Sequence, residues 1–244
     1  MIRELRTAGQ VRAACGDDDL LMWAAQGLAG GARAWALGDA VVAGCPGVSR
    51  RDRLGVWGGA SCAVDLVRHA LAELGPSYRP FGERELVRAV TAKLDGVEAG
   101  GEFSWMSLDV VPPGQREGGV GWLGGGDDGE VAALLAADAP ESYAVPGVAG
   151  VRRWAGVRAG GSLAAVAAEA WSAPTVGLLA GVATGARFRG RGLAGQVCRW
   201  VSRELVAACG RAALMVDDHN GAAIAVYERI GYRRRRVMAA RVAR

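Results

Sequence analysis

Apolar residues recur at helical spacing in five stretches of the chain. Between Ser61 and Leu74 an apolar side chain returns every three or four residues, and Gly75-Pro76 follows at once. This spacing predicts an amphipathic helix with Ser61 in the capping position and the Gly-Pro pair as its end. The same pattern predicts helices over residues 83–94, 130–137, 193–209 and 221–230.

Short apolar or alternating runs predict the strands. The run 176–184 is apolar throughout, as a strand in the centre of a sheet is. Gly160-Gly161 is typical of a tight hairpin turn, and Gly38-Asp39 marks another turn. Antiparallel strands followed by strand, helix, strand, helix and strand predict a mixed α/β layer fold. The predicted strands are two runs within 33–45, then 54–57, 103–110, 151–158, 163–171, 176–184, 212–216 and 232–242.

One segment has a strong loop composition and divides the chain. Residues 111–129 contain two prolines and eight glycines, which favour turns over regular structure. We place a domain boundary there, near residue 116, so that residues 1–115 and 116–244 form two domains. A length of 244 residues fits two compact domains of about 100 to 150 residues each.

Composition and charge exclude several classes of protein. The chain is 51% hydrophobic, and its apolar runs are interrupted well before the roughly 20 residues that would span a bilayer, so we expect no membrane partner. The 29 basic residues, all arginine except Lys93, face 25 acidic ones and are spread along the chain. That spread argues against a nucleic-acid partner. The run Tyr232–Arg236 is expected to form a solvated, partly ion-paired edge strand.

The cysteines and the N-terminal residues indicate the cellular compartment in which the protein is expected. Five cysteines form no Cys-x-x-Cys motif and are odd in number, so we expect reduced thiols and neither disulfides nor a metal site. Acidic residues occur early and no apolar signal segment follows Met1. These features favour a cytoplasmic protein.

The stretch from Val182 to Ala194 contains the residues that predict a ligand-binding site. A buried strand runs into a Gly/Arg loop, and a helix follows, so the free backbone N–H groups of a helix N-terminus are presented to a ligand. Gly190 and Gly192 let that backbone approach a ligand closely. Arg187, Arg189 and Arg191 add cationic donors, and the whole stretch predicts a pyrophosphate cradle.

Two cofactor classes use such a cradle. Gly190-x-Gly192-x-x-Gly195 also fits the dinucleotide fingerprint, with Asp217 or Asp218 as the ribose partner. That fingerprint opens a parallel sheet, whereas only one helix and one strand follow Asp218 here. The chain after Asp218 is therefore too short to complete a Rossmann domain.

The same residues resemble the GNAT superfamily of acyl-CoA-dependent N-acetyltransferases. Its pyrophosphate motif, Gln/Arg-x-x-Gly-x-Gly/Ala, is matched by Arg189-Gly-Arg-Gly192-Leu-Ala194. A second signature, an asparagine and a tyrosine seven residues apart on the next helix, is matched by Asn220 and Tyr227. The resemblance covers about residues 127–244 and implies the GNAT-type acyltransferase fold, with acetyl-CoA as co-substrate.

The resemblance also implies roles for individual residues. Backbone groups at the end of the strand would hold the pantetheine arm together with Asn220, and the amides of the loop would hold the pyrophosphate. Tyr227 would protonate the departing thiolate after an amine attacks the thioester carbonyl. The cofactor-binding set is Val182, Ala183, Thr184, Arg187, Arg189, Gly190, Arg191, Gly192, Leu193, Ala194 and Asn220.

A general base is also needed, because the attacking amine must lose a proton. Glu169, near the end of the strand before the central one, is the candidate, against the alternative of an exposed structural acid. Asp217 and Asp218 stay open as bases, although acids ahead of a helix more often act as caps. His219 could shuttle a proton.

The first half carries no such motif. Val56–Cys62 lies where a cradle would be expected and lacks the arginine and glycine pattern. We interpret residues 1–115 as a degenerate GNAT-like copy in a tandem arrangement, or as a cap domain. The expected activity is acetyl transfer from acetyl-CoA to a primary amine of a small or amino-acid-like acceptor, and pairing into a homodimer at a sheet edge stays open. The alternative is a non-catalytic, acyl-CoA-binding regulatory protein.

Overall fold

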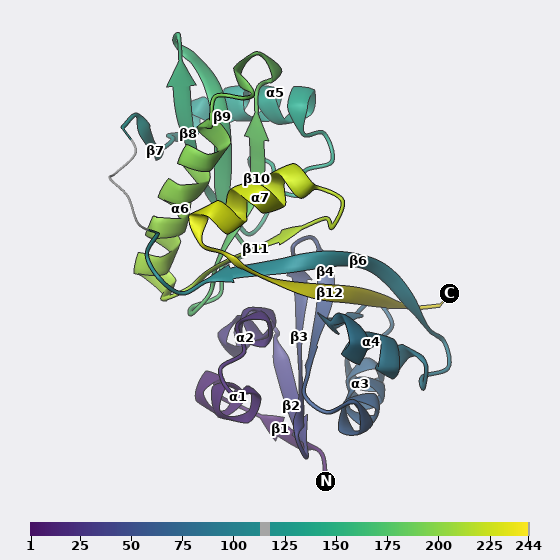
Figure 1. Ribbon diagram of the computed structural model, residues 1–244. Helices are drawn as coiled ribbons and strands as arrows, with labels where there is room; N and C mark the ends of the chain where they lie inside the picture. Colours follow the sequence, from purple (N-terminus) through teal and green to yellow (C-terminus); the bar gives the residue numbers. More distant parts are fainter. Residues whose placement is uncertain (113–117, 244) are drawn as a thin grey trace. The chain divides into compact units, whose positions relative to one another are not determined.

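The computed structural model describes residues 1–112 and 118–243 (Figure 1). The chain divides into two compact units. Unit 1 is Met1–Trp105 with the C-terminal segment that starts at Arg234, and unit 2 is Met106–Arg233. The division after Trp105 falls inside a strand, whereas the boundary predicted near residue 116 lies outside the described residues.

Unit 1 has strands with helices on both faces. Its strand order is β1-β2-β3-β4-β5-β12-β6, with β4 and β5 parallel. Leu21 and Ala24 of α2 pack over Gly55 on one face, and Leu74 of α3 packs over Gly44 on the other. The elements in chain order are β1 Arg3–Leu5, α1 Ala8–Cys15, α2 Asp19–Ala25, η1 Gln26–Leu28, β2 Arg33–Leu37, β3 Ala40–Val48, β4 Arg51–Trp57, α3 Ala60–Leu74, β5 Arg79–Glu83, α4 Arg84–Thr91 and β6 Val97–Leu108.

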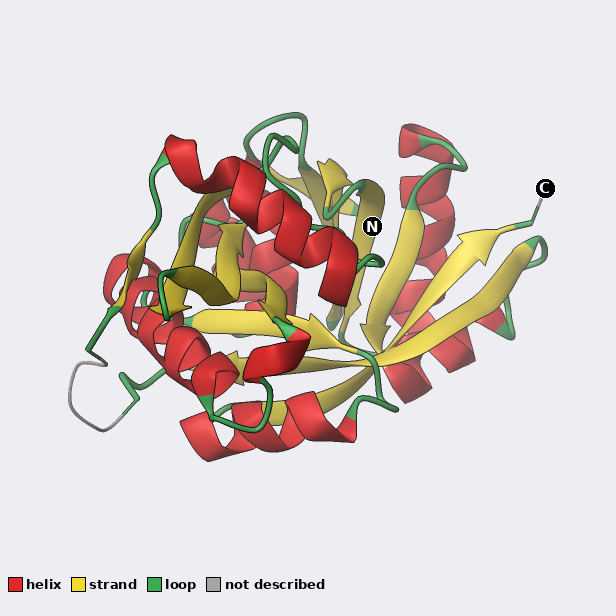
Figure 2. Ribbon diagram, turned by 90° about the horizontal axis from the view of Figure 1, so that it is seen from above, coloured by secondary structure: helices red, strands yellow, loops and turns green. Residues whose placement is uncertain are grey.

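The last strand of the chain, β12 (Arg233–Val242), completes the sheet of unit 1. It pairs antiparallel with β5, for example Met238 with Gly82, and runs beside β6 on its other side (Figures 1 and 2). The expectation of an edge strand is therefore wrong. The physical reason is that Val237 and Met238 are buried, so the arginine run at the start of the strand leads into a core segment. Arg233 pairs with Asp109, and Arg235 pairs with Asp18 and Asp19.

Unit 2 has the mixed α/β plan predicted for the second half. Its strand order is β11-β10-β9-β8-β7, and the end of β6 lies beside β11. Its helices begin and end within two residues of the predicted bounds. The elements are β7 Val120–Trp122, η2 Gly125–Asp127, α5 Asp128–Asp138, β8 Val151–Ala159, β9 Ser162–Ala170, β10 Gly177–Thr184, η3 Ala186–Phe188, α6 Leu193–Cys209, β11 Ala212–Val216 and α7 Gly221–Ile230.

The core of unit 2 lies between its sheet and α6. Val197, Val201 and Leu205 of α6 pack against Leu179 of β10 and Leu214 of β11. Helix α5 packs on the opposite side of β9 and β10, behind the strands in Figure 1. Apolar side chains at helical spacing therefore hold α6 along the strand that ends at the predicted cradle.

Three other expectations have a structural outcome. All five cysteines are free, and three of them, including Cys198, are buried. The capping residue of α3 is Gly59 and not Ser61. Within the described residues, no helix has the length and apolar character needed to cross a membrane.

Candidate functional site

The central strand β10 separates from its parallel neighbour β11 after two residues. Gly177 pairs with Ala212 and Leu178 with Ala213, and the described ladder between these strands ends there. From that point β10 is paired only with β9. Ala180, Gly181 and Val182 are half-buried, although buried residues lie on either side of them in the strand. Their backbone groups on the β11 side are thus available to a bound molecule.

A bulge in β10 lies at this opening. The register with β9 shifts between Ala180 and Ala183, and Gly181 has φ +61°. A Cβ placed at Gly181 would lie 2.5 Å from Cη2 of Trp154 and 3.1 Å from Cβ of Ala144. Only glycine therefore fits here, and the ring of Trp154 backs the bulge from the β8 side.

The loop after β10 leads to an open helix N-terminus. Gly190 and Gly192 have φ values of +75° and +73°, and a Cβ at either would meet no atom within 4 Å. Gly192 is the N-cap of α6 and supplies no side-chain cap to the helix. The N–H groups of the first turn of α6 are therefore uncapped and face an unfilled space, which is the arrangement that binds phosphate groups.

The three arginines of the loop have different positions. Arg189 donates to the Asp138 carboxylate at 2.7 Å and to the backbone carbonyl of Thr184 at 3.3 Å. Arg187 and Arg191 are exposed, with guanidinium carbons 4.6 and 5.7 Å from the ring centre of buried Phe188. Arg189 thus holds the loop against α5, while Arg187 and Arg191 remain at the surface beside the cradle.

Thr184, at the end of β10, has a side-chain hydroxyl with no hydrogen-bond partner among the described residues. Its Oγ1 is buried. A buried hydroxyl without a partner costs about 1–3 kcal/mol. The resemblance implies a cofactor whose arm lies along the end of β10, and the orphaned hydroxyl and the open cradle both fit such an acyl-CoA.

Replacing Thr184 by the isosteric valine tests this fit. Thr184→Val should leave the melting temperature of the free protein unchanged or higher, because an unsatisfied hydroxyl is removed. It should weaken CoA binding by about three- to tenfold, the equivalent of one hydrogen bond. Calorimetric titration with CoA measures the second effect, and Thr184→Ser should retain binding. A valine variant that binds CoA normally would show that the hydroxyl has no role toward it.

Asn220 caps α7, and Tyr227 lies seven residues further along the helix. Asn220 is the N-cap, and its Oδ1 accepts a hydrogen bond from the Ala223 N–H at 3.1 Å. The cap bond uses only the side-chain oxygen, so the NH₂ group of this exposed residue keeps its two donors. The structure therefore gives Asn220 a capping role and leaves its amide donors for a ligand.

Tyr227 is buried in the core of unit 2. Its ring lies edge-on to Tyr232, with centres 5.9 Å apart, and Tyr232 shares a 2.7 Å hydrogen bond with Ser202. Burial raises the pKa of Tyr227 well above its ordinary value. The phenol is consequently protonated throughout the neutral range, as a proton donor must be.

Glu169 lies on β9 opposite Leu179, and its side chain is only 1% exposed. Oε1 pairs with Arg152 at 3.1 Å, and Oε2 pairs with Arg153 at 2.8 Å. The structure therefore gives Glu169 a charge-pairing role between β8 and β9, unlike the exposed acid considered above. Each oxygen keeps a second acceptor site beside its arginine, and the catalytic role of Glu169 stays a prediction.

A matched pair of variants separates these roles. Glu169→Gln should lower the free energy of unfolding by about 1–3 kcal/mol, because a buried carboxylate partner of two arginines is lost. Glu130→Gln is the control, since Glu130 pairs with Arg158 but is 51% exposed, and it should change stability by less. A general base predicts in addition a loss of kcat of at least about 100-fold. An unchanged kcat would remove Glu169 from the reaction.

The other candidate proton carriers lie in one turn before α7. Asp217 and His219 are exposed, and Asp218 is half-buried. The Asn220 N–H donates to the Asp217 carbonyl, and the Gly221 N–H donates to the His219 carbonyl. Their backbone thus shapes the turn that presents Asn220, and their side chains stay candidates only.

The corresponding place in unit 1 is closed. There β4 is joined to α3 by Gly58 and Gly59 alone, whereas eight residues join β10 to α6. A Cβ at Gly59 would lie 2.3 Å from a carboxylate oxygen of Asp39, and a Cβ at Gly58 would lie 2.1 Å from the Asp39 carbonyl oxygen. The turn between β2 and β3 therefore fills the N-terminus of α3, which has no room for a pyrophosphate.

Comparisons with known proteins agree with this geometry. The family described as FR47-like protein matches residues 155–241. A putative acetyltransferase of the GNAT family from Novosphingobium aromaticivorans is 26% identical, with a TM-score of 0.53 over 84% of this chain and 88% of that one. This chain belongs to the GNAT superfamily. No curated protein matches it.

Two further structures share the fold of this GNAT protein. A GCN5-related N-acetyltransferase from Kribbella flavida is 19% identical, with a TM-score of 0.58, and covers 91% of this chain and 94% of its own. Another from Sphaerobacter thermophilus is 13% identical, with a TM-score of 0.54 and coverage of 98% and 94%. The fold is thus that of GNAT acetyltransferases, and this fold indicates acyl transfer from acetyl-CoA.

Sequence reasoning missed three residues that shape the site, and it left Trp154 open as a core or cleft-lining aromatic. Gly181 forms the bulge, Asp138 anchors Arg189, and Phe188 supports the two exposed arginines. Phe188 and Gly181 carry a usable signal, an aromatic residue inside a Gly/Arg loop and a glycine inside an apolar strand. Asp138 carries none, because it reaches the site only through the fold.

Proposed function

We propose that this GNAT protein transfers the acetyl group of acetyl-CoA directly to a primary amine of a small or amino-acid-like acceptor. The observation that carries the proposal is the separation of β10 from β11 after Leu178 and Ala213, next to the uncapped N-terminus of α6. An opening of this kind receives an extended chain between two strands, with its phosphates at the helix end. Acetyl-CoA supplies an activated acyl group when bound there.

Different residues of unit 2 would bind the pyrophosphate and the pantetheine arm of acetyl-CoA. The amides from Gly190 to Ala194 would hold the pyrophosphate, with Arg187 and Arg191 beside them, and Arg189 would keep the loop in place. Backbone groups of Val182, Ala183 and Thr184 would hold the pantetheine arm, together with the exposed amide of Asn220. This arrangement would position the thioester, which supplies much of the rate of such a reaction.

Proton transfer completes the proposal. Tyr227, kept protonated by burial, would donate to the departing sulfur. A strand N–H beside the bulge at Gly181 would stabilise negative charge on the carbonyl oxygen. Glu169 is the candidate for removing the proton of the amine, either directly or through water, subject to the variant pair described above.

Two measurements test the class of cofactor and the reaction. A thermal-shift series should show stabilisation by CoA and acetyl-CoA and none by NAD, because a ligand that binds the native state raises its stability. Release of free thiol from acetyl-CoA should follow addition of some members of an amine library. Stabilisation by NAD alone would overturn the proposed cofactor, and CoA binding without thiol release across the library would favour the regulatory alternative.

The setting of the reaction is also proposed. The five free cysteines support a reducing compartment such as the cytoplasm. Unit 1 would serve as a degenerate copy that binds no CoA, since Asp39 fills the end of α3. Titration with CoA should accordingly give one site per chain, and a second site of similar affinity would contradict this assignment.

A further inference from the structure

Unit 1 retains a small cavity of its own, of about 310 Å³. It lies at the carboxyl ends of the parallel strands β4 and β5, next to Trp57 and Glu83. Ligands of α/β proteins bind at this end of parallel strands. Within unit 2, the opening between β10 and β11 has the same relation to its strands. The cavity thus corresponds to the inner part of a cofactor groove whose phosphate end is closed by Asp39.

The size of the cavity excludes the cofactor and admits a small molecule. Pockets for small ligands range from about 300 to 1,000 Å³, so 310 Å³ holds a compact molecule and not a nucleotide with its pantetheine arm. Leu20 and Val56, each 2% exposed, and Leu86 form an apolar part of its wall. The half-buried indole of Trp57 adds an aromatic surface.

The charged groups of the cavity carry an excess of negative charge. Arg235 is the single cation of the lining and is already paired with both Asp18 and Asp19. Glu83 is the second carboxylate of the lining beside Asp18, whereas Asp19 lies outside it. Two carboxylates against one guanidinium leave a formal charge of −1 on the lining, which favours a cationic ligand.

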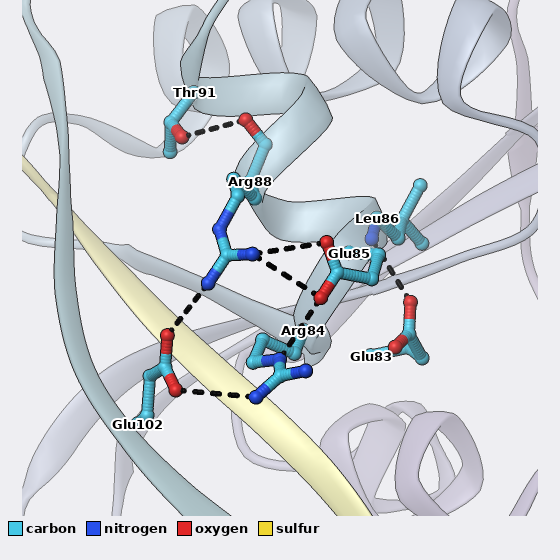
Figure 3. A network of polar contacts seen from close by, with 7 residues as sticks. All are labelled: Glu83, Arg84, Glu85, Leu86, Arg88, Thr91 and Glu102. Carbon is cyan, nitrogen blue, oxygen red and sulfur yellow. Dashed lines mark hydrogen bonds and ion pairs between the residues drawn. The ribbon is translucent and has the colours of Figure 1, made fainter.

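Glu83 has one oxygen engaged and one open. Its Oε2 accepts the Leu86 N–H at 2.9 Å and so caps α4. The other oxygen makes no bond with its neighbours in Figure 3, where Arg84, Arg88 and Glu102 are instead linked with one another and with Glu85. Arg84 and Arg88 are thus committed to another network. Arg235 attracts Glu83 through space while its ion pairs go to Asp18 and Asp19, so the open oxygen of Glu83 remains a partner for a cation.

We propose that this cavity binds a small organic amine, with its ammonium group at Glu83 and its apolar body against Trp57 and Leu86. An aromatic face beside a carboxylate suits an ammonium ion, since both attract positive charge. The site belongs to unit 1 alone and holds whether or not unit 2 transfers acetyl groups. It would make the protein responsive to an amine at a second place, apart from the proposed acceptor.

Benzylamine is a suitable probe, with benzyl alcohol and benzoate as uncharged and anionic analogues. Chemical shifts of the Trp57 indole N–H in the full chain should respond to benzylamine at neutral pH, more weakly to benzyl alcohol and not to benzoate. Glu83→Gln keeps an oxygen for the cap and removes the charge, and it should weaken binding by about threefold or more, as for a solvent-accessible ion pair. Glu85→Gln, in the first turn of α4 and outside the cavity, should leave binding unchanged.

Two outcomes would overturn the proposal. One is equal binding of benzylamine by the Glu83→Gln and Glu85→Gln variants, and the other is binding of benzoate as tight as that of benzylamine. Trp57→Leu serves as a second variant, which should weaken binding through loss of the aromatic face. The CoA-induced thermal shift should stay normal in all three variants, so failure of the proposed acetyl transfer would be recognised separately.

Discussion

Gly192→Glu should abolish measurable binding of CoA to unit 2. The new side chain would stand in the space in front of α6, where a Cβ at Gly192 meets no atom within 4 Å. Its carboxylate would satisfy the free amides of the first turn and repel a pyrophosphate. Two like charges 4 Å apart near a protein surface repel by about 4 kcal/mol, so binding should fall by more than about 100-fold. The loss of the CoA-induced thermal shift measures it.

A second glycine provides the control for backbone strain. Gly160, in the turn between β8 and β9, has φ +58° and also has nothing within 4 Å of its Cβ position. Gly160→Glu therefore carries the same cost of about 1–2 kcal/mol for a side chain in the left-handed region. It should lower the melting temperature as Gly192→Glu does and keep CoA binding intact. Loss of binding in both variants would mean that general destabilisation, and not the cradle, explains the effect.

Local patterns predicted most of unit 2. Its helices have regular apolar stripes and end at glycines such as Gly210 and Gly231, both in the left-handed region, so their bounds could be read from spacing alone. The cradle was predictable for the same reason, because it consists of consecutive residues. When a motif lies within one strand, loop and helix, its geometry follows from the local sequence alone.

Features that depend on distant partners could not be predicted in this way. The place of β12 beside β5 joins residues about 155 positions apart, and no local pattern records such a pairing. The same holds for Glu169, whose two arginines come from the neighbouring strand and turn an expected exposed acid into a buried one. The opening of β10 from β11 likewise depends on where a ladder ends. Only its bulge left a trace, the glycine at position 181.

Tyr227→Phe should slow acetyl transfer while leaving CoA binding nearly unchanged. The substitution removes only the phenolic hydroxyl, and the ring keeps its place against Tyr232 in the core. If that hydroxyl protonates the departing sulfur, kcat should fall by about 100-fold or more, the usual contribution of a general acid. Steady-state thiol release with a saturating amine acceptor measures kcat, and calorimetric titration measures CoA binding.

Tyr232→Phe is the matched control for this change. It removes the same atom from the adjacent buried ring, but that hydroxyl shares a 2.7 Å hydrogen bond with Ser202. The variant should therefore lose about 0.5–1.5 kcal/mol of stability and keep its kcat. Tyr227→Phe should therefore lower kcat, whereas Tyr232→Phe should lower the stability of the fold. Equal loss of kcat in both variants would assign Tyr227 a packing role, because disturbance of the shared core would then account for the slower reaction.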